Sequence, residues 1–381
     1  MSDNSDLVRL QGFDRQIGEI EMCVGDLFTH LDSTVSGEKK GNPQYSYDRP
    51  GYISNYVHRL VDMEGQFESE SPLGKILEGR RKASIQKLVA ISRIGTSDFT
   101  GAAERYYRNA VPSKEDVMTA VEVIGRTESS VDCDTLCVNA EGLGERMTEY
   151  LARKGVSGKR LWKVTVESPG PMERMPALSL NKTTKTVRIR DDYVKPERKA
   201  ETSVLHEGSH IMQWENGLRQ PLPNTFYHGT DGRSVATQEG LASIITEKEG
   251  FPGNMRKYAA YVIAVDSALK GATYMDIFQS MQKDYRFSEK DAKEIAHRVK
   301  RGLSDTSQPG GFVKDAVYML GRWRIHDHVG RHGESNEQET LKDFYIGNVA
   351  VEDMDSAYKW LLRDGIIRPA GYLPDCLEKK D

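Results

Sequence analysis

The sequence predicts a mostly helical α+β fold, in which a small mixed sheet comes directly before a long helix. Two observations carry this prediction. Apolar residues recur at helical spacing in the first third of the chain and again after residue 250, whereas residues 159–190 alternate and are rich in β-branched side chains. We therefore expect a helical N-terminal region over residues 1–155 and a second domain over residues 156–381.

The N-terminal region is predicted to consist of amphipathic helices separated by breaks rich in glycine and proline. The longest break, from Thr34 to Gly51, has turn composition throughout and predicts an exposed loop. Farther along, Ser113 follows Pro112 and can cap a helix that continues to about Gly125.

The predicted sheet consists of three short strands, over residues 161–166, 177–180 and 187–190. The segment N-K-T-T-K-T separates the last two strands and indicates a hairpin. Pro196 then opens a helix that stops at Asn216-Gly217. Further helices are expected over residues 256–269, 289–299, 312–322 and 353–362.

Composition excludes several classes of protein. The net charge of -4 gives no basic field for nucleic acid. The four cysteines are too few and too scattered for a disulfide framework, and Cys133 and Cys137 lack a second pair nearby that would complete a zinc knuckle. Because the N-terminus is polar and no apolar run is long enough to span a membrane, we expect a soluble cytoplasmic protein with no membrane partner. The oligomeric state is left open.

The central motif is His206-Glu207-Gly208-Ser209-His210, an H-E-x-x-H sequence within the predicted helix. Residues four apart stand on one face of a helix, so both imidazoles can reach a single metal ion. Glu207 lies about 100° around the helix from His206, which suits a carboxylate that contacts a metal-bound water without binding the metal.

A catalytic zinc site needs a third protein ligand, since it usually has three and keeps one position open. No histidine follows His210 before His228. Downstream, T-Q-E-G-L-A places Glu239 at the start of another helix, and Glu239 is the preferred third ligand. Asp231 and His228 are the alternatives.

A second group of histidines lies at His326, His328 and His332, and the last two are also four residues apart. Arginines surround this group, at Arg322, Arg324 and Arg331. We therefore favour a solvated basic face over a second metal site.

The metal constellation predicts amide hydrolysis by one zinc ion per chain. Zinc bound by two histidines and a glutamate polarises a carbonyl and lowers the pKa of bound water, while Glu207 takes the proton and passes it to the leaving amine. Tyr318, His228 or Arg219 could donate a hydrogen bond to the oxyanion, and the sequence does not rank them.

The segments around these residues resemble the QEGLA-motif family. That family includes the microtubule-associated tyrosine carboxypeptidases and bacterial proteins described as flavohemoglobin expression-modulating. The similarity rests on H-E-G-S-H-I-M-Q-W-E-N-G-L-R-Q-P-L and T-Q-E-G-L-A, and it continues through three later segments, R-V-K-R-G-L, G-G-F-V-K-D-A-V-Y-M-L-G and D-G-I-I-R-P-A-G-Y-L-P.

The resemblance implies a zincin-like catalytic domain that removes a C-terminal residue, which is tyrosine from α-tubulin in the eukaryotic members. It carries the ligand set over to His206, His210 and Glu239, and the base to Glu207. In the tubulin-acting members three residues separate the glutamate from the second histidine, whereas this chain has two, so substrate choice does not transfer with the motif.

A carboxypeptidase also needs a cation for the terminal carboxylate of its substrate, a protein or peptide C-terminus. Arg219, Arg298, Arg301 and Lys314 lie in the family-like segments and are the candidates, although each could equally be an ordinary surface charge or ion-pair partner. Two rival functions stay open: a zinc endopeptidase, and a regulatory protein with a retained metal site. The intact Glu207 argues against the second, because a structural site needs no base.

Overall fold

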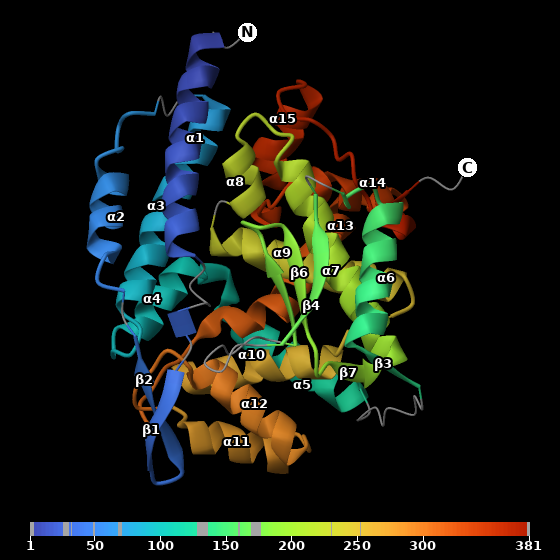
Figure 1. Ribbon diagram of the computed structural model, residues 1–381. Coiled ribbons are helices and arrows are strands. Elements are labelled where there is room, and N and C mark those ends of the chain that lie inside the picture. The colour runs from blue at the N-terminus through green and yellow to red at the C-terminus, as the bar shows by residue number, and fades with distance from the viewer. Residues whose placement is uncertain are drawn as a thin grey trace.

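The computed structural model describes residues 4–25, 30–31, 33–48, 50–67, 71–127, 136–158, 161–168, 177–229, 231–251 and 253–378. Helices dominate these ranges and three small sheets accompany them, which confirms the mostly helical α+β class (Figure 1). Among the described helices, none has both the length and the apolar character needed to cross a membrane. Cys133, part of the cysteine pair considered above, lies outside the described residues.

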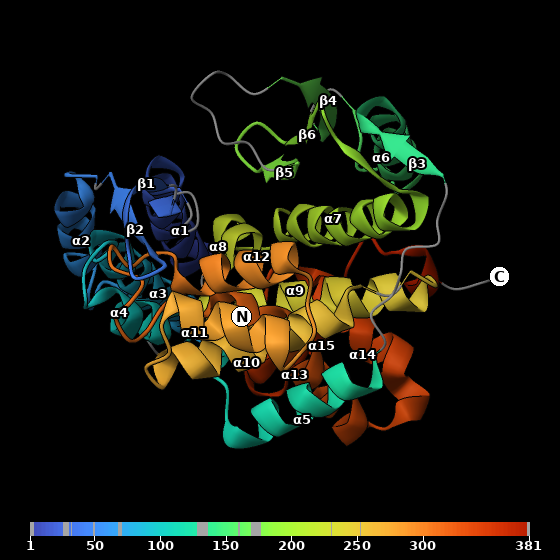
Figure 2. The ribbon, with the colours of Figure 1, turned by 90° about the horizontal axis from the view of Figure 1, so that it is seen from below.

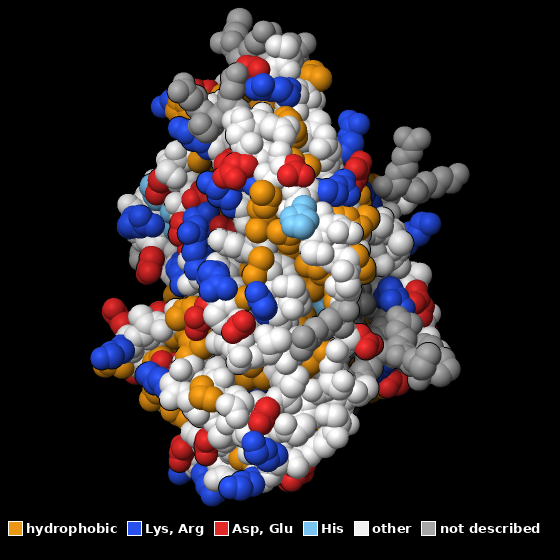
Figure 3. Space-filling view, turned by 90° about the vertical axis from the view of Figure 1, so that its left-hand side faces the viewer, with side chains coloured by type: hydrophobic (Ala, Val, Ile, Leu, Met, Phe, Trp, Pro, Cys, Tyr) orange, Lys and Arg blue, Asp and Glu red, His pale blue; other side chains and the backbone are white. Residues whose placement is uncertain are grey.

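Four N-terminal helices stand along one side of the molecule: α1 (Asn4–Val24), α2 (Ile53–Val61), α3 (Pro72–Ser92) and α4 (Phe99–Tyr106) (Figure 1). A buried ion network joins two of them, because Arg80 of α3 donates to Asp14 of α1 at 2.8 Å and to Glu21 at 2.7 Å. Asp14 also accepts from the backbone and hydroxyl of Thr225, far along the chain. The outer face of these helices carries acidic and basic side chains intermixed (Figure 3).

The predicted loop from Thr34 to Gly51 is wrong, since most of it forms an antiparallel hairpin of β1 (Ser33–Lys39) and β2 (Asn42–Tyr47). Lys40 and Gly41 both have positive φ, 53° and 80°, as a two-residue hairpin turn requires. The hairpin pairs with a distant segment, where the Tyr45 amide donates to the Ser304 carbonyl at 2.8 Å. The composition of this segment is typical of turns, so it did not indicate strands. Part of what holds the hairpin in place, Ser304, lies some 260 residues farther along the chain.

The predicted strands are confirmed with small shifts in their bounds. β4 (Lys163–Glu167) runs parallel to β6 (Thr186–Arg190), and β5 (Leu178–Asn181) runs antiparallel to β6, giving the mixed order β4-β6-β5. A second pair joins β3 (Cys137–Asn139) to β7 (Val194–Pro196). The helix predicted after Ser113 is α5 (Lys114–Arg126), and α6 (Ala140–Arg153) accompanies the sheet.

The helix that carries the H-E-x-x-H motif, α7 (Glu197–Gly217), lies between two layers. The three-stranded sheet and α6 cover one side, and a group of C-terminal helices covers the other (Figure 2). The helical segments that follow include α8 (Pro223–His228), α9 (Gly232–Lys248), α10 (Met255–Leu269), α11 (Tyr274–Lys283), α12 (Glu289–Lys300), η3 (Val313–Ala316), α13 (Val317–His332), α14 (Glu337–Asp343), η7 (Met354–Tyr358) and α15 (Lys359–Arg363). All four helices predicted after residue 250 are present, although the last begins as a π-helical turn, η7.

Two glycines let α9 and α13 cross in direct backbone contact. A Cβ at Gly240 would lie 2.4 Å from the Arg322 nitrogen, and one at Gly321 would lie 1.8 Å from the Ala236 carbonyl oxygen. Any larger side chain would therefore separate the helices. Gly240 follows Glu239, and Gly321 lies one turn after Tyr318, so the crossing brings these two side chains to the same place.

Buried apolar residues from both sides of the predicted boundary at residue 155 belong to one core cluster, which extends from Leu10 to Leu377. The division into domains over residues 1–155 and 156–381 stays a prediction.

Candidate metal centre

Three side chains from two helices converge on one point. The Nε2 atoms of His206 and His210 lie 3.1 Å apart, and the Glu239 Oε2 atom lies 3.2 Å from the first and 3.4 Å from the second. Donor atoms around a tetrahedral zinc with bonds of about 2.0–2.1 Å would stand roughly 3.3 Å from one another. The three donors are thus already spaced as ligands of one small cation.

The second histidine is held by aromatic packing. Trp214, one turn farther along α7, stacks on the His210 ring with centroids 5.9 Å apart and an interplanar angle of 17°. Trp162, which comes just before β4, stacks on Trp214 and donates through Nε1 to Glu215 at 2.9 Å. The sheet layer therefore fixes the imidazole of His210, whose Nδ1 is buried without a hydrogen-bond partner among the described residues.

Gly208, inside the H-E-x-x-H motif, is required by the packing of α6 on α7. A Cβ at this position would lie 2.3 Å from a ring carbon of Tyr150. The buried Tyr150 ring fills the space that a side chain would need. Its neighbour Glu207, one position after His206 on α7, is only partly buried.

The acid of the trio has a cation beside it. Lys314 of η3 places its Nζ atom 3.5 Å from the second oxygen of Glu239, Oε1. Although burial opposes ionisation, Lys314 and the hydrogen bonds with His206 and His210 hold the pKa of the Glu239 carboxyl well below its usual range. Glu239 is therefore a carboxylate at neutral pH, the form that binds a metal ion.

Tyr318 lies on α13 next to this centre. Its ring stacks on Tyr258 of α10, with centroids 4.9 Å apart and planes 11° apart, and the Lys314 ammonium lies 5.7 Å from its centroid. Burial, followed by the negative charge of Glu239, raises the pKa of the Tyr318 hydroxyl. The phenol stays protonated and can donate a hydrogen bond.

The two predicted arginines of the α12 region meet at Asp315, which is fully buried. Arg298 donates to one Asp315 oxygen at 2.5 Å, and Arg301 donates to the other at 3.0 Å. The Arg298 side chain is 25% exposed and that of Arg301 only 7%, so Arg298 is the one that a ligand can reach more readily.

Three other predicted residues lie elsewhere. Arg219 is exposed two residues past the end of α7, over the ring of Tyr372, and it lies nine positions after His210 in the chain. The structure thus does not bring Arg219 to the centre as a substrate-binding or oxyanion-binding group. His228 ends α8, where burial and nearby Arg80 and Lys182 lower its pKa although Glu21 opposes them. Asp231 caps α9 and binds Arg233 at 2.6 Å.

The second histidine group is not a solvated basic face, because His328 is 1% exposed. Its ring lies 4.6 Å from that of His332, and Asp355 of η7 approaches both. Burial lowers the pKa of His328 to about 4, with Lys359 adding to the effect and Asp355 opposing it, so the imidazole is neutral at pH 7. Sequence reasoning missed this because the acid comes from a segment 23 residues beyond His332.

Several other contributing residues carried no local signal in the sequence. Tyr258 and Tyr150 each lie far from the motif along the chain, and only their packing brings them to it. Asp315 could have been noticed as the acid that follows Lys314 in G-G-F-V-K-D, within four residues of Tyr318.

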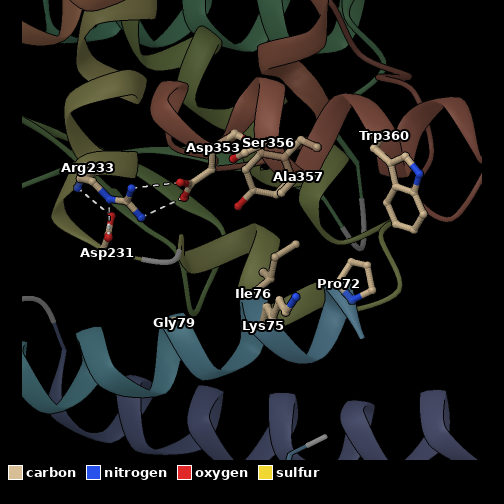
Figure 4. A pocket seen from close by; sticks show the side chains of 11 residues that line it. Pro72, Lys75, Ile76, Gly79, Asp231, Arg233, Asp353, Ser356, Ala357 and Trp360 are labelled. Carbon is tan, nitrogen blue, oxygen red and sulfur yellow. Dashed lines mark hydrogen bonds and ion pairs between the residues drawn. The ribbon is translucent and has the colours of Figure 1, made fainter. Parts of the chain in front are cut away.

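A cavity of about 470 Å³ lies between α3 and the C-terminal segment, away from the three converging donors. Lys75, Arg233 and Trp360 are among the residues that line it, and none of the three donors does (Figure 4).

Comparison with known proteins gives a consistent match. A family model described as microtubule-associated tyrosine carboxypeptidase matches residues 35–381. Microtubule-associated tyrosine carboxypeptidase 1 of Mus musculus is 32% identical over 166 residues, and that of Homo sapiens is 30% identical over 167 residues. Each match covers 41% of this chain and 32% of the relative, so the chain matches about a third of the length of these proteins.

Among solved structures, a Shewanella oneidensis lipoprotein of unknown function aligns with a TM-score of 0.36 and 15% identity, covering 81% of this chain and 69% of that one. A score this low supports no statement about the fold.

Proposed function

Because the chain belongs to the microtubule-associated tyrosine carboxypeptidase family, we propose that it is a zinc metallocarboxypeptidase that removes a residue such as tyrosine from a free C-terminus. The observation that supports the proposal is the convergence of His206, His210 and Glu239, with Glu207 beside them on α7. In this proposal the catalytic domain, residues 156–381, is zincin-like, since a small mixed sheet covers the H-E-x-x-H helix.

The donor set fits zinc. Two imidazoles and one carboxylate are a usual ligand set for catalytic zinc, and three ligands leave a coordination position open. When bound there, zinc would polarise the scissile carbonyl and lower the pKa of water at the open position. The His210 Nδ1 atom, buried and without a hydrogen-bond partner among the described residues, indicates that His210 is held by packing, with its Nε2 directed at the centre.

The chain's own groups then divide the proton transfers. Glu207 accepts the proton of the attacking water and later delivers it to the amine of the leaving residue. The Tyr318 hydroxyl, which stays protonated, donates to the oxygen that gains charge in the transition state. Its stacking on Tyr258 fixes the direction from which it donates.

The terminal carboxylate of the substrate would be bound by Arg298 and Lys314. Both lie near Tyr318, and Arg298 keeps part of its side chain exposed while Asp315 holds it from behind. Arg301, which is almost fully buried, positions Asp315 instead of contacting substrate. A cation pair at this place favours a free carboxylate over an amidated or continuing chain, and thus a carboxypeptidase over an endopeptidase.

A tubulin tail is one candidate substrate, because the relatives are named microtubule-associated tyrosine carboxypeptidases and tubulin is the protein of microtubules. The two-residue spacing between Glu207 and His210 differs from the three-residue spacing of the tubulin-acting members. Other C-terminal tyrosine peptides are therefore included in the test.

A library of peptides with free C-termini, digested by zinc-loaded protein and read by mass spectrometry, tests the proposal. We expect single-residue loss, strongest for C-terminal tyrosine, and no reaction on C-terminally amidated copies. The Glu207→Gln variant should keep its zinc and lose about 10²–10⁴-fold in rate, because it lacks the base.

Internal cleavage of amidated peptides would replace the carboxypeptidase with an endopeptidase. Cleavage that survives chelation, or that Glu207→Gln leaves unchanged, would overturn the metallopeptidase itself. Zinc binding with no cleavage of any peptide, tubulin tails included, would favour the regulatory alternative.

A further inference from the structure

A second cluster of possible ligands lies at the C-terminal end of α13. His328 and His332 project from the helix one turn apart, and Asp355 of η7 faces both. The Asp355 carboxylate lies 2.9 Å from His332 Nε2 and 3.6 Å from His328 Nδ1. One donor atom from each residue falls within 4.8 Å of the other two, which allows a small cation to bind all three after minor side-chain adjustment.

His328 is the unusual member of this cluster. It is 1% exposed, and neither ring nitrogen has a hydrogen-bond partner among the described residues. Phe344 packs edge-on against the ring, with centroids 5.4 Å apart. Buried imidazoles ordinarily satisfy at least one nitrogen, so His328, which has Nδ1 directed at Asp355 and no hydrogen bond to another described residue, is available to bind a metal ion.

A positive charge already stands among the donors. The Lys359 ammonium lies 3.1 Å from the Asp355 Oδ1 atom and 3.1 Å from His332 Nε2. The side chain of Lys359 is 30% exposed, so it can turn into solvent without crossing the core. The cluster therefore already surrounds a positive charge, the Lys359 ammonium. Because the lysine side chain is flexible, this ammonium can move away and a metal ion can take its place.

We propose that His328, His332 and Asp355 form a second metal site, which takes a borderline divalent ion such as zinc and displaces the Lys359 ammonium. Two imidazoles and a carboxylate select ions of the zinc, cobalt and nickel group over magnesium or calcium, which prefer oxygen ligands.

The expected role of this site is structural. The residue after His328 is Val329, so this pair lacks a counterpart of Glu207. His328 also lies ten positions after Tyr318 on α13, which is about 15 Å along the axis. The ion would fasten η7 to α13. Asp353, just before η7, also holds Arg233 of α9 at 2.8 and 3.0 Å (Figure 4).

Counting bound zinc after equilibrium dialysis of the full chain tests the proposal. We expect two ions per wild-type chain, one in Asp355→Asn and one in His332→Ala, whose side chains are partly exposed and tolerant of substitution. Combining Asp355→Asn with His206→Ala should leave none. Lys359→Met should tighten binding at the second site by about tenfold, because it removes a competing charge.

The site can also be tested without counting ions. In a His206→Ala background, zinc should still raise the melting temperature, and Asp355→Asn should abolish that rise. If the wild-type chain binds one ion and Asp355→Asn binds none, the second site is supported and the zinc site at His206 and His210 is contradicted. One ion that Asp355→Asn leaves in place, or two ions that survive both Asp355→Asn and His332→Ala, would overturn the second site.

Discussion

Two histidine pairs with the same four-residue spacing stand on two helices of this molecule, and each receives an acid from another element. His206 and His210 meet Glu239 of a regular helix, whereas His328 and His332 meet Asp355 of a π-helical turn. The first pair has Glu207, Tyr318 and the ion pairs of Asp315 near it, whereas the Lys359 ammonium lies among the donors of the second. In the two proposals the shared spacing lets each cluster bind a cation, and the groups around each cluster decide whether chemistry can follow.

The largest expected difference lies in activity. Under the proposed function, His206→Ala should reduce peptide hydrolysis to the level of chelator-treated wild type, because one of the three proposed zinc ligands is lost. His332→Ala, the matched change in the other cluster, should leave kcat/KM within about twofold of the wild-type value. His328 of that cluster lies about 15 Å from Tyr318 along α13, and His332 lies one turn farther on. Comparable losses in both variants, measured on folded protein with a C-terminal tyrosine peptide, would show that the two clusters act together.

A smaller effect is expected on stability in acid. Burial opposes ionisation of Asp315, yet Arg298 and Arg301 lower its pKa to about 2 from the usual 3.8. Because the folded pKa is depressed, the carboxylate stabilises the fold above pH 3.8, and this contribution, about 2 kcal/mol, is lost as the pH falls through 2. Asp315→Asn should flatten this dependence and cost about 3–5 kcal/mol at pH 7, since it removes the buried charge to which Arg298 and Arg301 both donate.

Urea unfolding measured between pH 2 and pH 7 checks that prediction. Asp355→Asn is the control in the second cluster: its carboxylate is 42% exposed, and the change should alter zinc-free stability by about 1 kcal/mol or less. If Asp315→Asn and Asp355→Asn lower the free energy of unfolding by the same amount, the expected difference between the buried ion pairs of Asp315 and the exposed ion pairs of Asp355 is wrong.

The third prediction concerns helix packing near each cluster, which is tight at Gly240 and open at Gly330. Gly240→Ala should force α9 and α13 apart, lower stability by about 1–3 kcal/mol and weaken zinc binding through Glu239. Gly330→Ala, on α13 where an added Cβ meets nothing within 4 Å, should be neutral or raise stability by up to about 1 kcal/mol. Thermal unfolding and zinc titration of both variants measure the difference, and equal losses would remove the glycine crossing as its cause.

Regular elements with local signals could be predicted from the sequence. The strand pattern before the H-E-x-x-H helix and the helices after residue 250 are confirmed, because side-chain periodicity reports them directly. The β1–β2 hairpin was missed because its strands are held by pairing with Ser304 and Asp305, which composition does not reveal. The π turn at η7 likewise reads as an ordinary helix in the sequence.

Of the candidate metal centre, too, the sequence predicted only the features that depend on local spacing and motif. Spacing on one helix predicted which histidines face one another, and Glu239 stands beside them as the sequence suggested. The cation next to Glu239 and the burial of His328 depend on contacts between helices that lie far apart in the chain. Arg219 had the right charge and a family-like setting, but it is exposed beyond the end of α7, which sequence proximity could not reveal.

The π turn of Met354–Tyr358 has a consequence for comparing relatives of this chain. A π turn holds one more residue than an α-helical turn of the same length, so deleting one residue would restore a regular helix. Such a deletion would leave the segments on either side of the turn in nearly the same phase, and it would reposition the side chains within the turn, Asp355 among them. A one-residue gap at this point in an alignment should therefore distinguish family members that keep the second cluster from those that have lost it.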